Sequence, residues 1–284
     1  MIYYIKILRD LHIYFLIFNK CFFLLFFDKY INMPKSNNLT ILPVKNQENE
    51  AYKGINIDKK LPQLPQLILQ VAPIKAGKTV RTANLFFNDN FYRDVFDHIY
   101  VFSPSLYADP INQAYLKDDD FSTFDEYSDD MVKQIIKNQM DRPKDERPLI
   151  AFLFDDLIGS LNPNTAFAFK LATKFRHYNV GMMVFNTQSL RSVPPILRNN
   201  CTSVLLSFFT NTKEEKKIYE EYAEYYGGEK KFHSLYHGIL ENSPRYDFLV
   251  LRLDQNPATC EHGFGNTIGL NTTPIKSEDE YNDI

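Results

Sequence analysis

Short apolar runs alternate with amphipathic, helix-like stretches through the middle of this chain. The runs that we expect to form buried strands are residues 66–71, 98–103, 148–156, 180–186, 202–209 and 246–253. Helical spacing of apolar residues appears at residues 80–87, 128–139, 164–177 and 212–226. Strands that alternate with helices favour a mainly parallel central sheet covered by helices on both faces. The pattern therefore predicts an α/β fold.

The amino-terminal residues 1–32 do not follow this alternation. They hold an apolar run of 17 residues, Leu11 to Phe27, which is interrupted in its middle by Asn19 and Lys20. A membrane-spanning helix needs about 20 apolar residues, and a central lysine costs roughly 2.5–3.5 kcal/mol. No small-residue cleavage site of a signal peptide follows the run. We therefore expect translation to begin at Met33, with a membrane anchor as the second interpretation and a signal peptide as the third.

Composition divides the rest of the chain into three parts. Residues 33–65 form a polar extension that ends in a stiff, proline-containing segment, because each proline disfavours helix in the residue before it. Residues 66–256 hold the predicted strands and helices and are the expected core. Residues 257–284 are expected to form a polar tail.

The loop after the first predicted strand resembles a phosphate-binding loop. Its residues run into a helical pattern and read Ala72-Pro73-Ile74-Lys75-Ala76-Gly77-Lys78-Thr79-Val80. In such a loop the backbone N–H groups face the phosphates of a nucleotide, Lys78 reaches the β- and γ-phosphates, and Thr79 holds Mg²⁺. The usual spacing is G-x-x-x-x-G-K-[ST], and Ala72 in the first position requires a negative φ there. A chance Gly-Lys-Thr in a surface turn is the alternative, but the flanking strand and helix favour a nucleotide site.

Two adjacent carboxylates close the strongest strand candidate, residues 148–156. The carboxyl ends of strands in an open α/β sheet face the crevice where ligands bind. We expect Asp155 to hold Mg²⁺ with Thr79 and Asp156 to polarise the attacking water. A strand-end turn or a helix cap is the alternative role for such a pair. In combination with the loop at Ala72–Thr79 the pair is far more specific.

Side chains after the neighbouring strand complete the expected site. Gln188 follows residues 180–186 and is a candidate sensor of the γ-phosphate, although Asn186 could do the same work. Arg198 and Arg176 stand next to predicted strands, and an arginine supplied across a subunit boundary neutralises charge in the transition state. A salt bridge on an exposed turn is the alternative for both arginines.

A second ligand set can be read from the histidines, but its spacing is unfavourable. His233 and His237 are four residues apart and would face the same way on a helix. Cys260 and His262 complete four potential zinc ligands, yet they lack compact paired spacing and fall in the expected tail. We therefore discount a zinc site made from these four residues.

Bulk composition narrows the classes of function. The net charge is −3, with a pI near 6.1, so any contact with nucleic acid must come from local patches rather than from a global basic field. The cysteines are three in number and far apart, which argues against a disulfide framework and fits a reducing compartment.

With these residues assembled, the chain resembles the genome-packaging ATPases of large double-stranded DNA viruses of eukaryotes and their virophages, which belong to the FtsK–HerA superfamily of P-loop motors. The resemblance covers roughly residues 66–256. The parts that carry it are Gly77-Lys78-Thr79, Asp155-Asp156, Arg176-His177, Thr187-Gln188 and the segment Pro194 to Asn200. It departs from the family at Ala72 and Ala76, where Gly or Ser is usual, and at Asp156, where many relatives carry Glu.

The resemblance implies a P-loop NTPase fold of the RecA/ASCE type and an ATP-driven, Mg²⁺-dependent motor. Lys78 and Thr79 would contact nucleotide and Mg²⁺, Asp156 would be the catalytic carboxylate, Gln188 the sensor and Arg198 the trans-acting finger, with Arg176 as the other candidate. The partners implied are double-stranded viral DNA, capsid or portal-vertex proteins and further copies of the chain in a ring. A membrane is implied only if residues 1–32 are expressed. The expected location is the viral factory in the host cytoplasm, the virion, or both. Weak candidates for DNA contact are Lys213, Lys216, Lys217, Lys230 and Lys231.

Two other functions remain open from the sequence. A P-loop NTPase of another class, such as a nucleotide kinase or a switch, is the first, although neither an arginine-rich lid nor an Asn-Lys-x-Asp guanine motif is present. A membrane-tethered virion protein with a degenerate loop and no enzymatic activity is the second.

Overall fold

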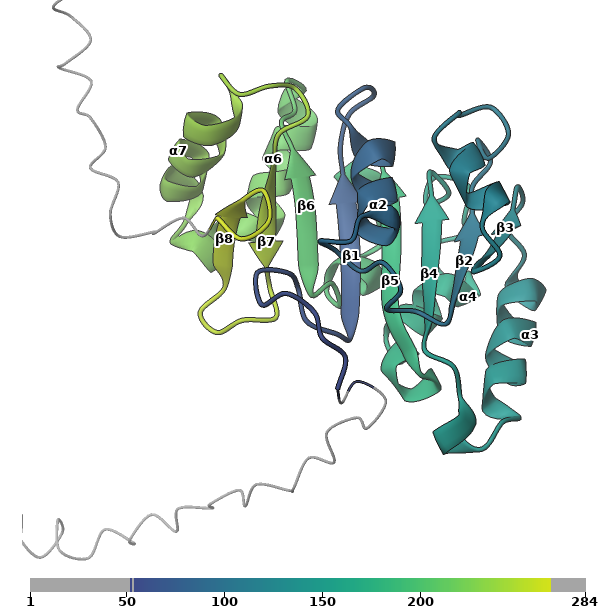
Figure 1. The fold of residues 1–284 in the computed structure, drawn as a ribbon. Coiled ribbons are helices and arrows are strands. Elements are labelled where there is room, and N and C mark those ends of the chain that lie inside the picture. Colours follow the sequence, from purple (N-terminus) through teal and green to yellow (C-terminus); the bar gives the residue numbers. More distant parts are fainter. Residues whose placement is uncertain (1–51, 53, 267–284) are drawn as a thin grey trace, which may run out of the picture. The chain divides into compact units, whose positions relative to one another are not determined.

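The computed structural model describes residues 52 and 54–266, which build one eight-stranded sheet with helices on both faces (Figure 1). The order of the strands across the sheet is β3-β2-β4-β5-β1-β6-β7-β8. Neighbours from β3 to β6 run parallel, whereas β7 is antiparallel to β6 and β8 is antiparallel to β7. This arrangement confirms the predicted α/β fold with a mainly parallel sheet. The strands are β1 (Gln66–Val71), β2 (His98–Phe102), β3 (Phe121–Phe124), β4 (Ile150–Asp155), β5 (Val180–Thr187), β6 (Ser203–Ser207), β7 (Phe248–Arg252) and β8 (Thr259–His262).

Alternate residues of the central strands supply two separate hydrophobic cores. Phe152 and Phe154 of β4 pack on one face of the sheet, and Ala151 and Leu153 pack on the other. Successive side chains of a strand point to opposite faces, so a strand covered on both sides is apolar at nearly every position. This is why β4 appears in the sequence as a continuous apolar run rather than as an alternating one.

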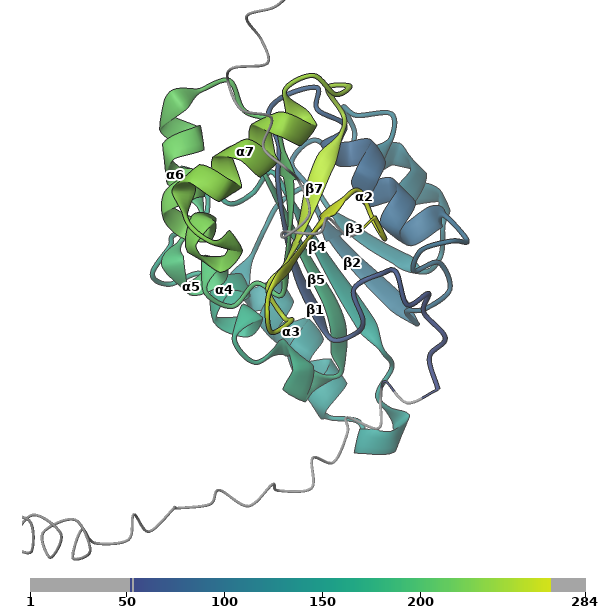
Figure 2. The same ribbon diagram turned by 90° about the vertical axis from the view of Figure 1, so that its left-hand side faces the viewer.

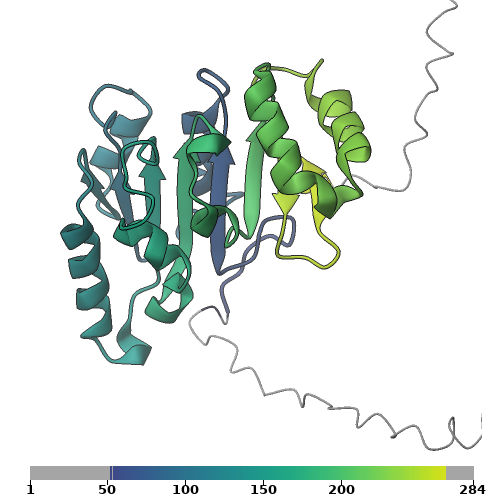
Figure 3. The same ribbon diagram turned by 180° about the vertical axis from the view of Figure 1, so that it is seen from behind.

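Helices cover the two faces unequally. Helix α2 (Lys78–Phe87) lies on one face together with buried residues of the segment 54–65, such as Ile57 and Leu61. The other face carries most of the helices (Figures 2 and 3). They are α3 (Asp129–Met140), α4 (Phe167–Ala172), α5 (Pro195–Arg198), α6 (Thr212–Tyr222) and α7 (Glu229–Leu240). Short 3₁₀ turns connect these elements at η2 (Asn112–Lys117), η3 (Lys144–Glu146), η4 (Phe175–Tyr178), η5 (Leu190–Ser192) and η6 (Ala223–Tyr226).

The elements that the sequence pattern did not show include the strands β3 and β8 and the helices α5 and α7. Strand β3 lies in the acidic stretch between β2 and α3, helix α7 precedes β7, and β8 extends the sheet into the expected tail. The helix predicted at 164–177 is broken into α4 and the 3₁₀ turn η4. With β8 at one end and Ile57 and Leu61 at the other, the sheet and its cores take in residues on both sides of the range 66–256.

The carboxyl ends of the parallel strands all lie on the same side of the sheet, and the loops that follow them position the site. The carboxyl ends of β1, β2, β4 and β5 all lie there because their pairings are parallel. Strand β5 lies between β1 and β4, so the loops that follow these three strands are neighbours. None of the helices in the described part of the chain is long and apolar enough to cross a membrane. The anchor considered for residues 1–32 lies outside the described residues.

Candidate functional site

The loop between β1 and α2 has a backbone suited to binding phosphate. Gly77, which precedes α2, has a φ of 77°, a left-handed conformation that glycine adopts most readily. A Cβ at this position would also meet the Cβ of Tyr246 at 3.0 Å. No side chain caps the first turn of α2, so its N–H groups remain available for an anion. The φ of Ala72 is not positive, and the sequence analysis required this of an alanine in the first position of the loop.

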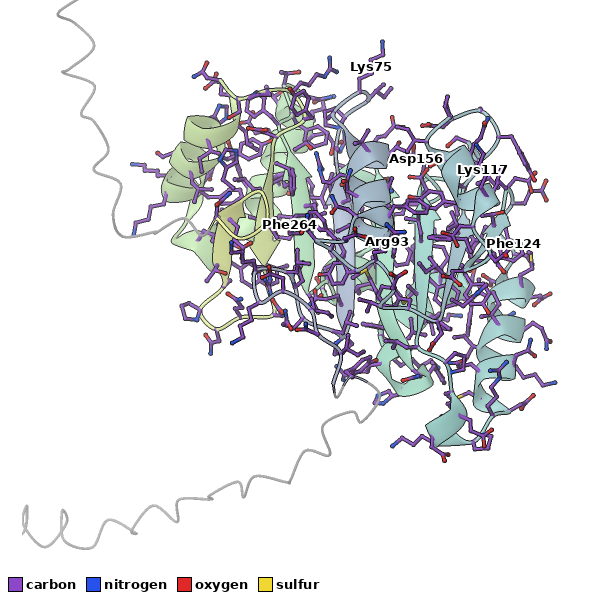
Figure 4. All side chains as sticks on the ribbon, viewed as in Figure 1. Lys75, Arg93, Lys117, Phe124, Asp156 and Phe264 are labelled. Carbon is purple, nitrogen blue, oxygen red and sulfur yellow. The ribbon has the colours of Figure 1, made fainter. Side chains whose placement is uncertain are left out.

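The tip of this loop is exposed. Ile74 and Lys75 are both exposed, and Lys75 has a φ of 63°. The Ala76 N–H closes the turn by donating to the Pro73 carbonyl at 3.2 Å. Lys75 points away from the sheet at the tip, and Asp156 lies close to the loop at the end of β4 (Figure 4). The loop therefore presents a lysine to solvent at Lys75 and holds Lys78 beneath it, nearly buried.

Three residues from three chain segments meet at the mouth of the loop. The Lys78 ammonium forms a short ion pair with Oδ1 of Asp156. Gln188 donates from Nε2 to Oδ2 of the same carboxylate at 3.3 Å. Asp156 has a φ of 51°, which asparagine and aspartate tolerate better than other non-glycine residues. The structure thus brings the phosphate loop and the acidic pair together, and the catalytic roles of these residues remain predictions.

The two adjacent aspartates have very different surroundings. Asp155 is 3% exposed, and its carboxylate accepts hydrogen bonds from Asn186 Nδ2 at 2.8 Å, Ser103 Oγ at 3.0 Å and Asn112 Nδ2 at 3.4 Å. The side chain of Asp156 is 33% exposed. Asp155 is therefore a fixed carboxylate, and Asp156 is one that can change partners.

A buried polar network that the sequence analysis missed supports this arrangement from below. Gln70 on β1 donates from Nε2 to Asn186 Oδ1 and to Thr82 Oγ1, both at 2.8 Å, and to the Lys78 carbonyl at 3.1 Å. Asn186 also donates to Thr82 Oγ1 at 3.0 Å. Asn186 is buried and bonded to Asp155, whereas Gln188 is exposed. Of the two amides considered as a sensor, Gln188 is the one placed to face a nucleotide.

Arg81 is the largest omission of the sequence analysis. Its guanidinium donates to Gln70 Oε1 at 3.0 Å, to Ser207 Oγ at 3.1 Å and to the Ala76 carbonyl of the loop at 3.0 Å. It also donates to the Tyr246 carbonyl at 3.2 Å and lies 4.0 Å from the centre of the Phe248 ring. Burial lowers the pKa of Arg81 to about 10, which still leaves it charged at neutral pH. One buried cation thus holds the phosphate loop, β6 and the segment before β7 together.

Solved structures match this fold at low sequence identity. The DNA-packaging ATPase B204 of Sulfolobus turreted icosahedral virus has a TM-score of 0.52 at 10% identity, over 70% of this chain and 97% of that chain. The genome-packaging NTPase B204 of Sulfolobus turreted icosahedral virus 2, in complex with AMP, has a TM-score of 0.51 at 12% identity, over 69% and 96%. The chain has the fold of B204. No protein-family model matches the sequence, and no curated protein does.

A more distant likeness extends to EssC from Geobacillus thermodenitrificans. The TM-score is 0.44 at 15% identity, over 54% of this chain and 34% of that chain. This score is too low to carry an argument. The likeness to B204 supports the predicted α/β fold with a mainly parallel sheet.

The two predicted finger arginines, Arg176 and Arg198, lie in η4 and α5. Arg176 is exposed in η4, before the amino end of β5, whereas Gln188 follows its carboxyl end, so Arg176 and His177 are at the opposite edge of the sheet. This corrects the expectation that they border the site. Arg198 donates to Glu221 Oε2 at 2.9 Å and to the Val193 carbonyl, and its side chain is 11% exposed. Within a single chain Arg198 is therefore occupied by an internal ion pair, and its role as a finger remains a prediction.

Of the four residues discounted as a zinc set, His233 and His237 lie within reach of a common ligand, and neither Cys260 nor His262 joins them in the described part of the chain. His233 and His237 lie on α7, while Cys260 and His262 lie on β8. The expectation that Cys260 lies in a loose tail was wrong, because β8 pairs with β7 and buries it. Burial raises the pKa of the Cys260 thiol to about 12, which disfavours the thiolate that metals bind.

Two pockets of this protein adjoin the loop between β1 and α2. One, of about 420 Å³, has mostly apolar walls and shares Gly77 and Arg81 with the loop. Its other lining residues are Lys75, Val80, Asn84, Phe91, Tyr246, Phe248 and Phe264. The other pocket, of about 770 Å³, is lined by Pro73 and Ile74 of the loop, by Gln188 and by Glu241 after α7. The site thus opens on one side to mostly apolar, aromatic walls and on the other to walls that mix polar and apolar side chains.

Proposed function

We propose that this protein is an ATP-driven motor that moves double-stranded viral DNA into a capsid. The observation that carries the proposal is the meeting of Lys78, Asp156 and Gln188 at the uncapped amino end of α2. A DNA-packaging ATPase with the same fold supports the choice of DNA as the substrate that is moved. The place of action would be the viral factory of the host cell, at the capsid or portal vertex.

The Lys78–Asp156 ion pair gives a physical account of how the site would switch on. The carboxylate that would activate water is paired with Lys78 in the structure. The γ-phosphate of ATP would compete for the Lys78 ammonium and release Asp156. Gln188, already bonded to the other oxygen of Asp156, would then orient the attacking water between carboxylate and phosphate.

The residues expected to hold Mg²⁺ fit that ion by their chemistry. Thr79 offers a hydroxyl on the first turn of α2, and Asp155 offers a carboxylate fixed by three donors. Mg²⁺ prefers oxygen ligands, and nucleotide enzymes commonly hold it with one or two carboxylates and the phosphates. When bound, the ion would neutralise the charge that develops on the phosphates.

The aromatic pocket is the proposed seat of the adenine. It adjoins Gly77, so a nucleotide whose phosphates lie on the loop can place its base against Tyr246, Phe248 and Phe264. Aromatic rings stack well on a base. The B204 structure obtained with AMP supports an adenine nucleotide as the ligand of this fold.

Besides Arg198, which the resemblance implies as the trans-acting finger, Arg191 is a candidate for neutralising transition-state charge within its own subunit. Arg191 lies in η5, three residues after Gln188, and is exposed. Among the described residues it has no bonded partner, whereas Arg198 is held by Glu221. Glu221 is seven residues, or about 10 Å along the helix, from the turn of α6 that contacts the Gln188 loop.

Contacts to the DNA backbone would come from the exposed lysines of α6 and α7, namely Lys213, Lys216, Lys230 and Lys231.

The test is ATP hydrolysis by the purified full chain, with and without linear duplex DNA. We expect Mg²⁺-dependent hydrolysis that duplex DNA stimulates, and its loss in Lys78→Ala, because the ammonium no longer reaches the phosphates. Lys137→Ala is the matched control, since Lys137 is exposed on α3 away from the loop. Hydrolysis by Lys78→Ala at the parent rate would disprove the site. Hydrolysis that duplex DNA leaves unchanged would argue against the motor and for another class of P-loop NTPase.

A further inference from the structure

A second cluster of ligand-type side chains lies between α6 and α7, outside the nucleotide site. Glu215 of α6 and His233 and His237 of α7 each place a potential ligand atom within 4.8 Å of the other two. It is the one such group of three in the described part of the chain. The two helices lie side by side on the same face of the sheet (Figures 1 and 3).

The two histidines are arranged for a shared ligand. They are four residues apart on α7 and therefore lie on one face of the helix, one turn from each other. Their rings are nearly parallel, at 16°, with centroids 4.2 Å apart. The Nε2 atom of His237 is 2.6 Å from Oε1 of Glu215 on the facing helix. Three potential metal-ligand atoms, from two helices, thus lie close to one another.

The surroundings of His237 and Glu215 resemble the outer shell of a metal site. The other ring nitrogen of His237, Nδ1, is 3.3 Å from a carboxylate oxygen of Glu241. Tyr219 donates its hydroxyl to Oε1 of Glu215 at 2.5 Å. Histidines that bind metal almost always give their second ring N–H to a carboxylate, a carbonyl or water, which fixes the ring and the tautomer.

The charges around the cluster also favour a bound cation. Glu215 and Glu241 bring two carboxylates to two imidazoles, and neither carboxylate is bonded to a lysine or arginine in the described part of the chain. A divalent cation would balance this pair of charges. The aromatic rings of Phe208 and Tyr236 pack against His237, with their centroids 5.3 Å and 5.6 Å from the centroid of its imidazole ring.

We propose that Glu215, His233 and His237 bind a divalent transition-metal ion of the zinc class, which ties α6 to α7. Imidazole and carboxylate ligands suit Zn²⁺, at about 2.0–2.2 Å from the ion. In a tetrahedral site ligand atoms are then about 3.3 Å apart, so the contact between Glu215 and His237 opens by a small rotation on binding. The fourth position faces solvent, because His233 is exposed and the side chains of Glu215 and His237 are 18% and 21% exposed. Water would fill that position.

The test uses the full chain without an affinity tag, stripped of metal and titrated with Zn²⁺ and Co²⁺ in excess Mg²⁺. The Mg²⁺ occupies oxygen-only sites, so binding by the histidine cluster is measured alone. We expect one equivalent to bind, to raise the unfolding temperature and, for Co²⁺, to give a tetrahedral visible spectrum without a thiolate charge-transfer band. His233→Gln and His237→Gln should each weaken Zn²⁺ binding by at least about 100-fold, and Glu241→Gln by roughly 10-fold.

The matched control is His262→Gln, which removes a histidine bonded to Asp247 outside the cluster and should bind Zn²⁺ like the parent. His233 is exposed, so His233→Gln is the variant least able to disturb folding, and circular dichroism without metal verifies this. No binding by the folded parent would overturn the proposal. So would unchanged affinity in folded His233→Gln, or a thiolate band that makes a cysteine the ligand. None of these readouts depends on ATP hydrolysis, so failure of the motor proposal is seen separately.

Discussion

The phosphate loop stands on a buried floor and opens at an exposed rim, and the two treat their polar groups in opposite ways. We define the floor as Gln70, Arg81, Thr82, Asp155 and Asn186, and the rim as Lys78, Asp156 and Gln188. In the floor every side chain is buried and bonded to its neighbours. In the rim Lys78 is nearly buried, but its partner Asp156 has a carboxylate that is one third exposed, and Gln188 is exposed.

The difference separates holding the geometry from performing the reaction. Floor residues are bonded within the protein, so their removal leaves buried polar groups without hydrogen bonds and lowers stability. Asp155 differs from the other four in that it would also hold Mg²⁺ when nucleotide binds. Rim residues can exchange one partner for a phosphate or a water at little cost to the fold. A variant of the rim should therefore lose activity first, and a variant of the floor should lose stability first.

The largest expected effect sets the rim against the floor at adjacent positions. Asp156→Asn removes the proposed base, and we expect ATP turnover to fall by roughly 10²–10⁴-fold. Its unfolding free energy should change little, because water reaches the exposed carboxylate. Asp155→Asn places an amide among three donors, and we expect it to lose about 1–3 kcal/mol of stability. Its turnover should fall as well, because Asp155 is also the proposed Mg²⁺ ligand, so the stability loss is the readout that separates the two positions. Turnover assays and urea unfolding of both variants measure the contrast. Equal stability losses in the two variants would erase the distinction between floor and rim.

A smaller effect is expected inside the floor. Arg81→Gln leaves two carbonyls and two side-chain oxygens without their shared donor, and we expect a loss of about 2–3 kcal/mol. For a domain of this size that is about 5–10 °C in unfolding temperature. Arg93→Gln is the control, because Arg93 is half exposed and pairs only with nearby aspartates, so it should stay within about 0.5 kcal/mol of the parent. An Arg81 variant as stable as the Arg93 variant would show that the floor does not hold the loop.

Strand ends explain how much of this could be predicted from the sequence. Lys78, Asp156 and Gln188 each come after an apolar run, and parallel strands bring the residues after their carboxyl ends together, so the meeting of these three was predicted without coordinates. Arg81 and Gln70 lie inside a helix and a strand with no local pattern to mark them, and only packing shows that they face each other. Strand β8 was missed for a similar reason, because the pairing with β7 that buries Cys260 is not written in the local sequence. The pairing of Arg198 with Glu221 depends likewise on how α5 and α6 pack.

The smallest expected effect lies where α6 supports the rim. Glu214 is buried and accepts the Ser189 hydroxyl at 2.7 Å and the Leu190 N–H at 3.1 Å, which fixes the segment directly after Gln188. In Glu214→Gln one acceptor oxygen becomes an NH₂ group, which cannot accept either bond. We expect about 1 kcal/mol less stability.

Turnover in Glu214→Gln should also fall, because Gln188 is no longer held against Asp156, whereas KM for ATP should not change, since no phosphate or base contact is touched. Glu220→Gln is the control on the same helix, where the exposed Glu220 pairs with Lys217. If Glu214→Gln raised KM and left kcat at the parent value, Gln188 would be a residue that binds the nucleotide rather than one that positions the attacking water. Lys78 and Gln188 of the rim would then bind the nucleotide, and Asp156 alone would take part in the chemical step.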